Sequence, residues 1–212
     1  MWNLPNVITI TRIGLTPVIA LLPFIDGYLP KLFAFVLFVI TALTDLVDGY
    51  LARSRGEVTD LGKLLDPLAD KLLLLAALVP IYWIARVRQD FYGIPFWGSI
   101  PLWVCLLLLG REFAMTAFRR YAQARGVVIA AGSAGKLKTT VQNIFLGSIF
   151  AWFAYRDAAA QFGWQERAVG RFWTEFHGGF VAVTLALAAI LTIYSFAVYL
   201  YRYRAVFTLP RT

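Results

Sequence analysis

The sequence predicts an all-α integral membrane protein with six transmembrane helices in a single domain, residues 1–212. Hydrophobic residues make up 60% of the chain and charged residues only 15%, a composition typical of helical membrane proteins. Apolar stretches of about 20 residues, the length that crosses a hydrocarbon core, recur along the chain. Short connections and the lack of a linker-like run favour one domain over two.

The predicted spans are residues 7–25, 31–53, 62–85, 99–122, 137–155 and 179–201. No basic segment or small-residue cleavage site accompanies the first apolar run, so we interpret it as a retained helix and not as a cleaved signal peptide. The polar, glycine-containing stretch RSRGEVTDLG separates the second and third spans and predicts a reversal that makes them antiparallel neighbours. The remaining spans follow as apolar runs with short connections.

The single cysteine, Cys105, lies in an apolar run and excludes an intrachain disulfide. The single histidine, His177, falls in the connection before the last predicted span and is assigned no role.

The distribution of Lys and Arg predicts the orientation in the membrane, because these residues favour cytoplasmic helix ends. With six spans, both termini lie on one side. The cations of that side are Arg12, Arg53, Arg55, Lys63, Lys71, Arg111, Arg119, Arg120, Arg125, Lys136, Lys138, Arg202, Arg204 and Arg211. Those of the other side are Lys31, Arg86, Arg88, Arg156, Arg167 and Arg171. We therefore expect both termini in the cytoplasm.

The net charge of +8 fits this orientation together with attraction to anionic lipid. No segment resembles a nucleic-acid-binding motif, so we expect no nucleic-acid partner.

Four aspartates stand at helical spacing around the predicted reversal. Asp45 and Asp48 are three residues apart on the second predicted helix, and Asp66 and Asp70 are four apart on the third. Because the two helices are expected to be antiparallel neighbours, the four carboxylates can face one another.

The apolar part of each helix beyond its acids sets their depth. The stretches 32–44 and 72–85 are each about 20 Å long at 1.5 Å per residue. The acids are therefore expected in the cytoplasmic third of the membrane, in a cavity open to water, because an ionised carboxylate in hydrocarbon costs several kcal/mol.

Converging carboxylates repel one another and must take up protons or bind cations. Oxygen ligands without His or Cys suit hard ions such as Mg²⁺, Mn²⁺ or Ca²⁺. Two such ions could clamp a phosphoryl group during in-line displacement. In the alternative interpretation the acids form ion pairs with Lys63, Lys71, Arg53 or Arg111.

The residues between the acids fit phosphate chemistry. Gly49 and Ala52 leave room on the same face as Asp48, and Arg53 supplies a forked donor suited to a diphosphate.

The full pattern, D-x2-D-G-x2-A-R-x8-G-x3-D-x3-D, resembles the signature of the CDP-alcohol phosphatidyltransferase family. Its eight defined positions are Asp45, Asp48, Gly49, Ala52, Arg53, Gly62, Asp66 and Asp70. The resemblance implies that family's six-helix fold, a homodimer and two divalent metal ions, Mg or Mn. It also implies transfer of a phosphatidyl group from a CDP-linked lipid to an alcohol, with release of CMP.

By this resemblance Asp45, Asp48, Asp66 and Asp70 are the metal ligands, and Asp70 is also the catalytic base that takes the proton of the alcohol. The resemblance assigns the CDP-lipid pocket to Gly49, Ala52, Arg53 and Gly62.

A second pattern is similar to the bacterial phosphatidylglycerophosphate synthases, a branch of the family. It is carried by Arg111, Glu112, Arg119, Gly135, Lys136, Lys138, Thr139 and Gln142. It implies CDP-diacylglycerol and glycerol 3-phosphate as substrates, and the bacterial inner membrane as the location, with the active site facing the cytoplasm. Arg119, Lys136 and Lys138 are the expected ligands of the acceptor phosphate, although each could be an ordinary cytoplasmic flank.

Two alternatives remain open. Another family member could use inositol phosphate, serine or phosphatidylglycerol as acceptor. An ion-coupled transporter would also carry intramembrane acids, but it predicts acids spread along a path, whereas these cluster at one edge.

Overall fold

The computed structural model describes the backbone over residues 4–54, 59–95, 97–129 and 132–208. Within these ranges it describes every side chain except those of residues 5, 46–54, 60–61, 63–64 and 208. Apart from one isolated bridge between Ile94 and Gly98, the described regular structure is helical, which confirms the all-α prediction.

Six long helices match the six predicted segments. They are α1 (Leu4–Leu21), α2 (Tyr28–Ser54), α3 (Asp60–Val87), α5 (Leu102–Gln123), α6 (Ser133–Phe162) and α7 (Ala168–Arg202). The shorter described elements are α4 (Gln89–Tyr92) and the 3₁₀ turns Leu22–Phe24, Trp164–Glu166 and Arg204–Thr208.

Four of the long helices are long and apolar enough to cross a membrane: Asn6–Phe24, Tyr28–Asp45, Leu65–Val87 and Ala168–Arg202. Helices α5 and α6 are not among these four. Charged residues interrupt α5, whereas α6 carries lysines and uncharged polar residues along its first three turns. Large apolar side chains also face outward on all six long helices. The chain is thus an integral membrane protein, while the number of crossings stays a prediction.

The last helix is longer than predicted. It begins at Ala168 instead of residue 179, so His177 lies within α7 and not in a connection. His177 is buried, stacks on Trp152 with ring centroids 5.3 Å apart, and places Nε2 2.8 Å from the carbonyl oxygen of Ser148. Helix α6 also runs past residue 155, to Phe162, where Gly163 adopts the left-handed conformation (φ 65°) that ends it.

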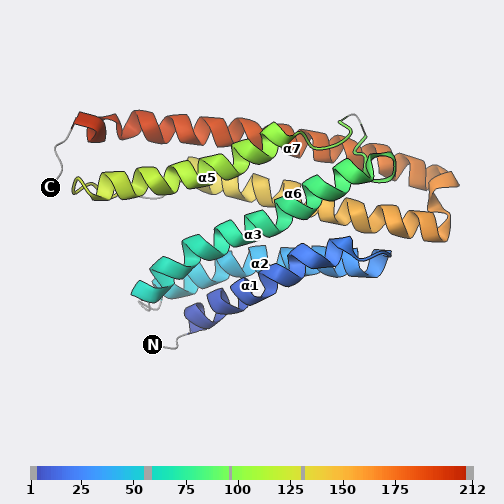
Figure 1. Cartoon of the computed structure of the whole chain (residues 1–212), viewed down its shortest axis with the longest axis horizontal. Helices are drawn as coiled ribbons and strands as arrows, with labels where there is room; N and C mark the ends of the chain where they lie inside the picture. The colour runs from blue at the N-terminus through green and yellow to red at the C-terminus, as the bar shows by residue number, and fades with distance from the viewer. Residues whose placement is uncertain (1–3, 55–58, 96, 130–131, 209–212) are drawn as a thin grey trace.

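The helices alternate in direction along the long axis of the molecule (Figure 1). Helices α2, α5 and α7 end toward the left of that view, where α1, α3 and α6 begin, and their other ends lie toward the right. Helix α1 packs on α2 and α3, whereas α6 packs on α2 and α7. Helix α2, which carries Asp45, therefore ends where α3, which carries Asp66 and Asp70, begins. The end of α5 and the start of α6 lie at the same end of the molecule.

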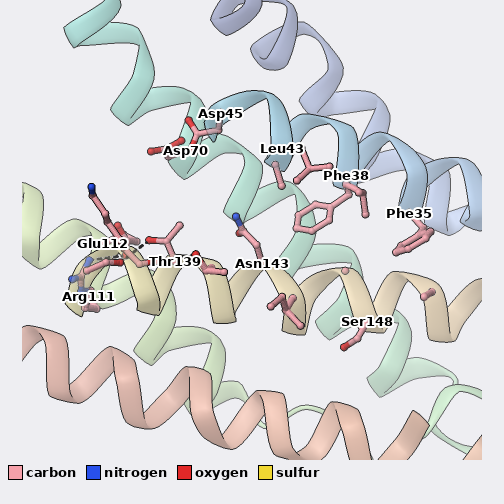
Figure 2. Close-up of a pocket in the computed structure, with 18 of the residues that line it drawn as sticks. Phe35, Phe38, Leu43, Asp45, Asp70, Arg111, Glu112, Thr139, Asn143 and Ser148 are labelled. Carbon is pink, nitrogen blue, oxygen red and sulfur yellow. Dashed lines mark hydrogen bonds and ion pairs between the residues drawn. The ribbon is translucent and has the colours of Figure 1, made fainter. Parts of the chain in front are cut away.

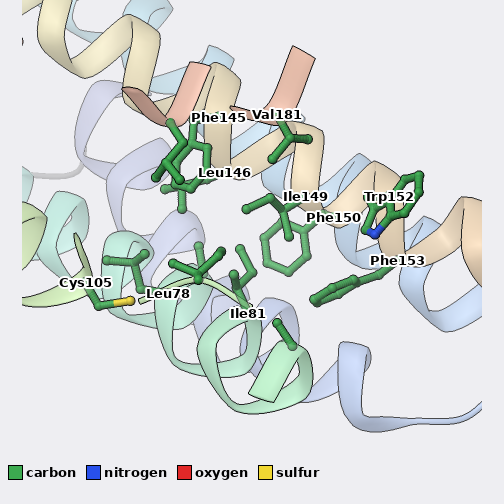
Figure 3. Close-up of a cluster of buried hydrophobic side chains, with 14 of the residues drawn as sticks. Leu78, Ile81, Cys105, Phe145, Leu146, Ile149, Phe150, Trp152, Phe153 and Val181 are labelled. Atoms are coloured by element: carbon green, nitrogen blue, oxygen red, sulfur yellow. The ribbon is translucent and has the colours of Figure 1, made fainter. Parts of the chain in front are cut away.

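The main core forms along α6 (Figure 3). Phe145, Ile149, Phe150 and Phe153 are each 1% exposed or less and belong to one buried cluster with side chains of α2, α3, α5 and α7. Cys105 belongs to this core, and no intrachain partner exists for it. These contacts hold α6 as the central element against which the site is built.

A buried charge network ties the helices together at the end opposite the acids. Lys31 Nζ lies 2.6 Å from Asp157 Oδ2, and Tyr92 donates its hydroxyl to Asp157 Oδ1 at 2.6 Å. Burial, together with this hydrogen bond, raises the pKa of Tyr92 well above its usual range, so the phenol remains a donor. The network joins α2, α4 and α6.

Replacing Lys31 by Met should destabilise the protein by about 3–5 kcal/mol, because it leaves the Asp157 carboxylate buried without its cation. Thermal unfolding in detergent measures the loss. The control is Arg86→Ala, because Arg86 is an exposed cation of α3 and its removal should cost less than about 1 kcal/mol. Equal losses in the two variants would contradict a structural role for the buried network.

Candidate functional site

An arginine from α1 lies between two of the predicted acids. Arg12 Nη1 contacts Asp45 Oδ1 at 2.6 Å, and its Nη2 contacts Asp70 Oδ1 at 3.1 Å. The Arg12 side chain is 4% exposed, whereas those of Asp45 and Asp70 are 29% and 57% exposed. One fixed positive charge thus joins α1, α2 and α3, and the carboxylates keep a face toward solvent.

Sequence reasoning missed Arg12 as a partner of the acids and considered Arg53, Lys63, Lys71 and Arg111 instead. The signal was present, because an arginine inside an apolar helix seldom lacks a carboxylate partner. Its partners, however, lie 33 and 58 residues away on other helices, and no local spacing relates them.

The third described acid is held separately. Asp66 accepts a hydrogen bond from the Thr9 hydroxyl at 2.9 Å. Thr9 and Arg12 stand one helical turn apart on α1, so the same face of α1 contacts acids from both α2 and α3. The side chain of Asp48 lies outside the described residues, although its backbone belongs to α2.

Gly62 lies where α3 begins to pack on α1. Thr59 caps the helix by accepting from the backbone N–H of Gly62 at 3.0 Å, and the Thr59 hydroxyl donates to Asn6 Oδ1 at 2.9 Å. A Cβ at residue 62 would lie 3.0 Å from Asn6 Oδ1, which accounts for the glycine by packing alone. The other three residues expected in the CDP-lipid pocket, Gly49, Ala52 and Arg53, have side-chain positions outside the described ones.

A large cavity of about 1060 Å³ opens beside the acids. Its polar part is lined by Asp45, Asp66 and Asp70 on one side and by Arg111, Arg119 and Lys136 on the other. Its apolar part is lined by side chains of α2, α6 and α7: Phe35, Phe38, Val39, Leu43, Ile144, Phe176 and Phe180. Figure 2 shows Asp45 and Asp70 facing Arg111, Glu112 and Thr139 across this space, with Phe35 and Phe38 farther along α2.

The wall opposite the acids is held by Glu112. One oxygen of Glu112 accepts from Lys138 Nζ and, at 3.0 Å, from Arg111 Nη1. Arg111 also donates to the Ser195 hydroxyl at 3.2 Å, which connects α5 to α7. Glu112 thus sets the position of two cations, one from each of α5 and α6.

The predicted acceptor cations do not all reach the large cavity. Arg119 and Lys136 line it, whereas Lys138 is 1% exposed and lines a separate small cavity of about 50 Å³ between Arg12 and Glu112. Residues two apart on a helix do not share a face, so Lys136 and Lys138 diverge. Lys138 stands behind the wall and Lys136 on its surface.

Comparison with known proteins assigns the family. The family description "CDP-alcohol phosphatidyltransferase" matches residues 2–194. The chain belongs to this family. Its curated relatives include the CDP-diacylglycerol–glycerol-3-phosphate 3-phosphatidyltransferase of Bacillus subtilis (strain 168), which is 40% identical over 161 residues, 70% of this chain and 77% of that protein. The protein of the same name from Rickettsia typhi is 37% identical over 166 residues, 76% of this chain and 86% of its own.

Members of this family generally depend on divalent metal. The acids fit such ions in chemistry, since Asp45, Asp66 and Asp70 offer only oxygen ligands to the cavity. Among the described side chains no three acids, histidines or cysteines converge closely enough to form a metal site by themselves. A full ligand set therefore requires a further group, and Asp48 is the predicted one.

Replacing Arg12 by Gln should make the stability of the fold depend on metal. Without divalent ions the variant loses about 1–3 kcal/mol, because Asp45 and Asp70 repel each other with no cation between them. Mg²⁺ should restore part of this loss, while wild type should respond less. Thermal unfolding of each protein in EDTA and in Mg²⁺ measures the difference, with Arg12→Lys as the charge-preserving control. A loss that Mg²⁺ does not change would contradict the electrostatic role of Arg12.

Proposed function

We propose that the protein transfers the phosphatidyl group of CDP-diacylglycerol to glycerol 3-phosphate, forming phosphatidylglycerol phosphate and CMP. The observation that carries the proposal is the large cavity, which joins acids and cations at one end to apolar side chains at the other. A nucleotide-linked lipid has both characters in one molecule. The names of relatives up to 40% identical contain the same pair of substrates, which supports the proposal.

In the proposed reaction the acceptor hydroxyl oxygen attacks the lipid-side phosphorus of the diphosphate. The new P–O bond forms as the bond to CMP breaks, and the hydroxyl proton leaves to a base. Asp70 is the proposed base because it lines the cavity and its side chain is 57% exposed. Arg12 holds Asp70 in place by donating a hydrogen bond from Nη2 to Oδ1 of Asp70.

Two divalent ions, Mg²⁺ or Mn²⁺, are proposed at Asp45, Asp48, Asp66 and Asp70. When bound, these ions would supply positive charge beside the diphosphate. That charge would stabilise the negative charge that develops on CMP as it leaves. Gly49, Ala52, Arg53 and Gly62 are the proposed pocket of the CDP-lipid. Gly62 acts there through its backbone position, since its Cβ space faces Asn6.

Arg119 and Lys136 are the proposed ligands of the acceptor phosphate, because both line the cavity opposite the acids. Lys138 takes a different part in this proposal. It supports the same site from behind through its ion pair with Glu112, which also holds Arg111 at the cavity wall.

We propose that the chain crosses a bacterial inner membrane six times, with both termini and the site on the cytoplasmic side. We also propose that it forms a homodimer. The connections at the acid-bearing end carry the larger share of Lys and Arg, which supports this orientation. The transporter alternative loses support, because Asp45, Asp66 and Asp70 line one cavity beside cations and are not spread along a path.

The decisive test is to incubate purified protein and Mg²⁺ with labelled CDP-diacylglycerol and, separately, glycerol 3-phosphate, inositol phosphate, serine and phosphatidylglycerol. Of the four acceptors, only glycerol 3-phosphate should yield a labelled lipid product, which should be phosphatidylglycerol phosphate. Turnover with a different acceptor would overturn the choice of substrate, and no lipid product with any acceptor would overturn the transferase proposal.

Asp45→Asn, Asp48→Asn and Asp66→Asn should each lower turnover by at least about a hundredfold, because each removes a ligand charge from the site that stabilises the leaving diphosphate. EDTA should do the same to wild type, and added Mg²⁺ should reverse it. Asp70→Asn should lose turnover while retaining CDP-diacylglycerol binding. Full activity in EDTA would contradict the metal proposal, and loss of binding in Asp70→Asn would make Asp70 chiefly a ligand.

Arg119→Ala or Lys136→Ala should raise the KM for glycerol 3-phosphate by about tenfold or more, on the order of 1.4 kcal/mol, because each removes a charge-assisted contact to its phosphate. The KM for CDP-diacylglycerol should change much less. Arg120→Ala is the control on the same helix, since Arg120 is exposed and does not line the cavity. Equal rises in both constants would make Arg119 and Lys136 structural flanks.

A further inference from the structure

The first turn of α6 meets a tyrosine from the far end of α7. Tyr199 is 4% exposed, and its hydroxyl oxygen accepts a hydrogen bond from the backbone N–H of Gly132, the residue just before α6 begins. Both residues line the large cavity. The contact spans 67 residues of sequence and anchors the end of α6 that carries Lys136.

Two glycines give this hydroxyl its space. A Cβ at Gly132 or at Gly135 would each lie 3.2 Å from the Tyr199 hydroxyl oxygen, closer than ordinary van der Waals contact. The next nearest atoms of the Tyr199 ring to a Cβ at Gly135 are 3.5 and 3.8 Å away, an ordinary distance. The crowding therefore comes from the hydroxyl oxygen and not from the ring.

The Tyr199 ring connects this helix start to α5. It belongs to a second buried cluster, with Met115 and Phe118 of α5 and Ile129 of the connection. Arg119 follows Phe118 directly, and Lys136 follows Gly135. One side chain thus contacts the segments that present both proposed acceptor cations.

We propose that Tyr199 is a positioning residue for the acceptor substrate: its hydroxyl seats the glycine-containing start of α6 so that Lys136 faces the cavity beside Arg119. The carbonyl oxygen of the same Gly132 accepts from the backbone N–H groups of Gly135 and Lys136, at 3.1 and 3.3 Å, so the residue that Tyr199 holds also closes the first turn of α6. Gly132 and Gly135 are small because the hydroxyl occupies the space of their side chains. The expected effect on the KM for glycerol 3-phosphate rests on the proposed function. The packing of the α6 start against the Tyr199 hydroxyl does not.

The kinetic test compares Tyr199→Phe with wild type. Removing the hydroxyl should raise the KM for glycerol 3-phosphate about fivefold, as expected for one neutral hydrogen bond, with kcat and the KM for CDP-diacylglycerol within twofold of wild type. The matched control is Tyr201→Phe, which removes the same group from an exposed residue of the same helix. An unchanged KM for glycerol 3-phosphate, or equal changes in all three constants, overturns the positioning role.

The packing test is a double-variant cycle by thermal unfolding. Gly135→Ala should raise the Tm more in the Tyr199→Phe background than in the wild-type background, because alanine favours the helix but crowds only the hydroxyl. Gly179→Ala of α7, where a Cβ meets nothing within 4 Å, should have the same effect in both backgrounds. Equal effects of Gly135→Ala in the two backgrounds overturn the seating of α6.

The two tests separate this inference from the proposed function. If wild type does not use glycerol 3-phosphate but the Tm cycle shows coupling at residue 135, the substrate assignment fails and the seating of α6 stands. If wild type uses glycerol 3-phosphate and the cycle shows no coupling, the seating fails alone. If Tyr199→Phe does not fold, Gly132→Ala in the wild-type background decides: it should raise the KM for glycerol 3-phosphate selectively, and an unchanged KM overturns the inference.

Discussion

The contact between Arg12 and two carboxylates is the interaction on which the site depends. Asp45 and Asp70 come from antiparallel helices, and without a cation between them their charges would push α2 and α3 apart. A guanidinium suits this place because its fork reaches two acceptors at once and its charge does not vary with pH. The cost of burying it is offset by the two ion pairs and by the solvent that the carboxylates still meet. The cavity can therefore keep acids near its mouth before any substrate or metal arrives.

The opposite wall follows the same logic with the signs reversed. There a single carboxylate, Glu112, lies between the cations of Arg111 and Lys138. Arg12 with its two aspartates and Glu112 with Lys138 border the same small cavity of about 50 Å³. Each charged wall thus has its own internal counter-charge. What remains for a substrate or a metal ion are the groups that keep an open face on the large cavity, which are Asp45, Asp66 and Asp70 on one side and Arg119 and Lys136 on the other. This arrangement divides the charged residues into those that build the site and those that can act in it.

Much of this architecture could be predicted from the sequence because it is local. The lengths of the apolar runs predict the long helices. The short polar stretch between α2 and α3 predicts that they are antiparallel neighbours, which places Asp45 and Asp70 near each other. The contacts of Arg12 and Tyr199 could not be predicted, since each depends on how distant helices cross. Helix ends were also missed: α7 begins eleven residues before the predicted span, because helical hydrogen bonding continues outside the apolar run that a hydropathy pattern detects. The separation of Lys136 from Lys138 is an intermediate case, because helical geometry alone implies it.

Helix α7 has 35 residues and is therefore about 52 Å long, well beyond the roughly 30 Å of a hydrocarbon core. Even a strongly tilted helix of this length extends into the headgroup layer or the water. Tyr199 lies three residues from its C-terminal end, so the start of α6 is held near the aqueous boundary, while Phe176 and Phe180 line the cavity more than four helical turns deeper. Under the proposed function the two reactants would then arrive by different routes. A water-soluble phosphate ester would enter from the aqueous boundary, whereas the acyl chains would enter laterally from the surrounding leaflet. The lipid product could then return to the leaflet without crossing water.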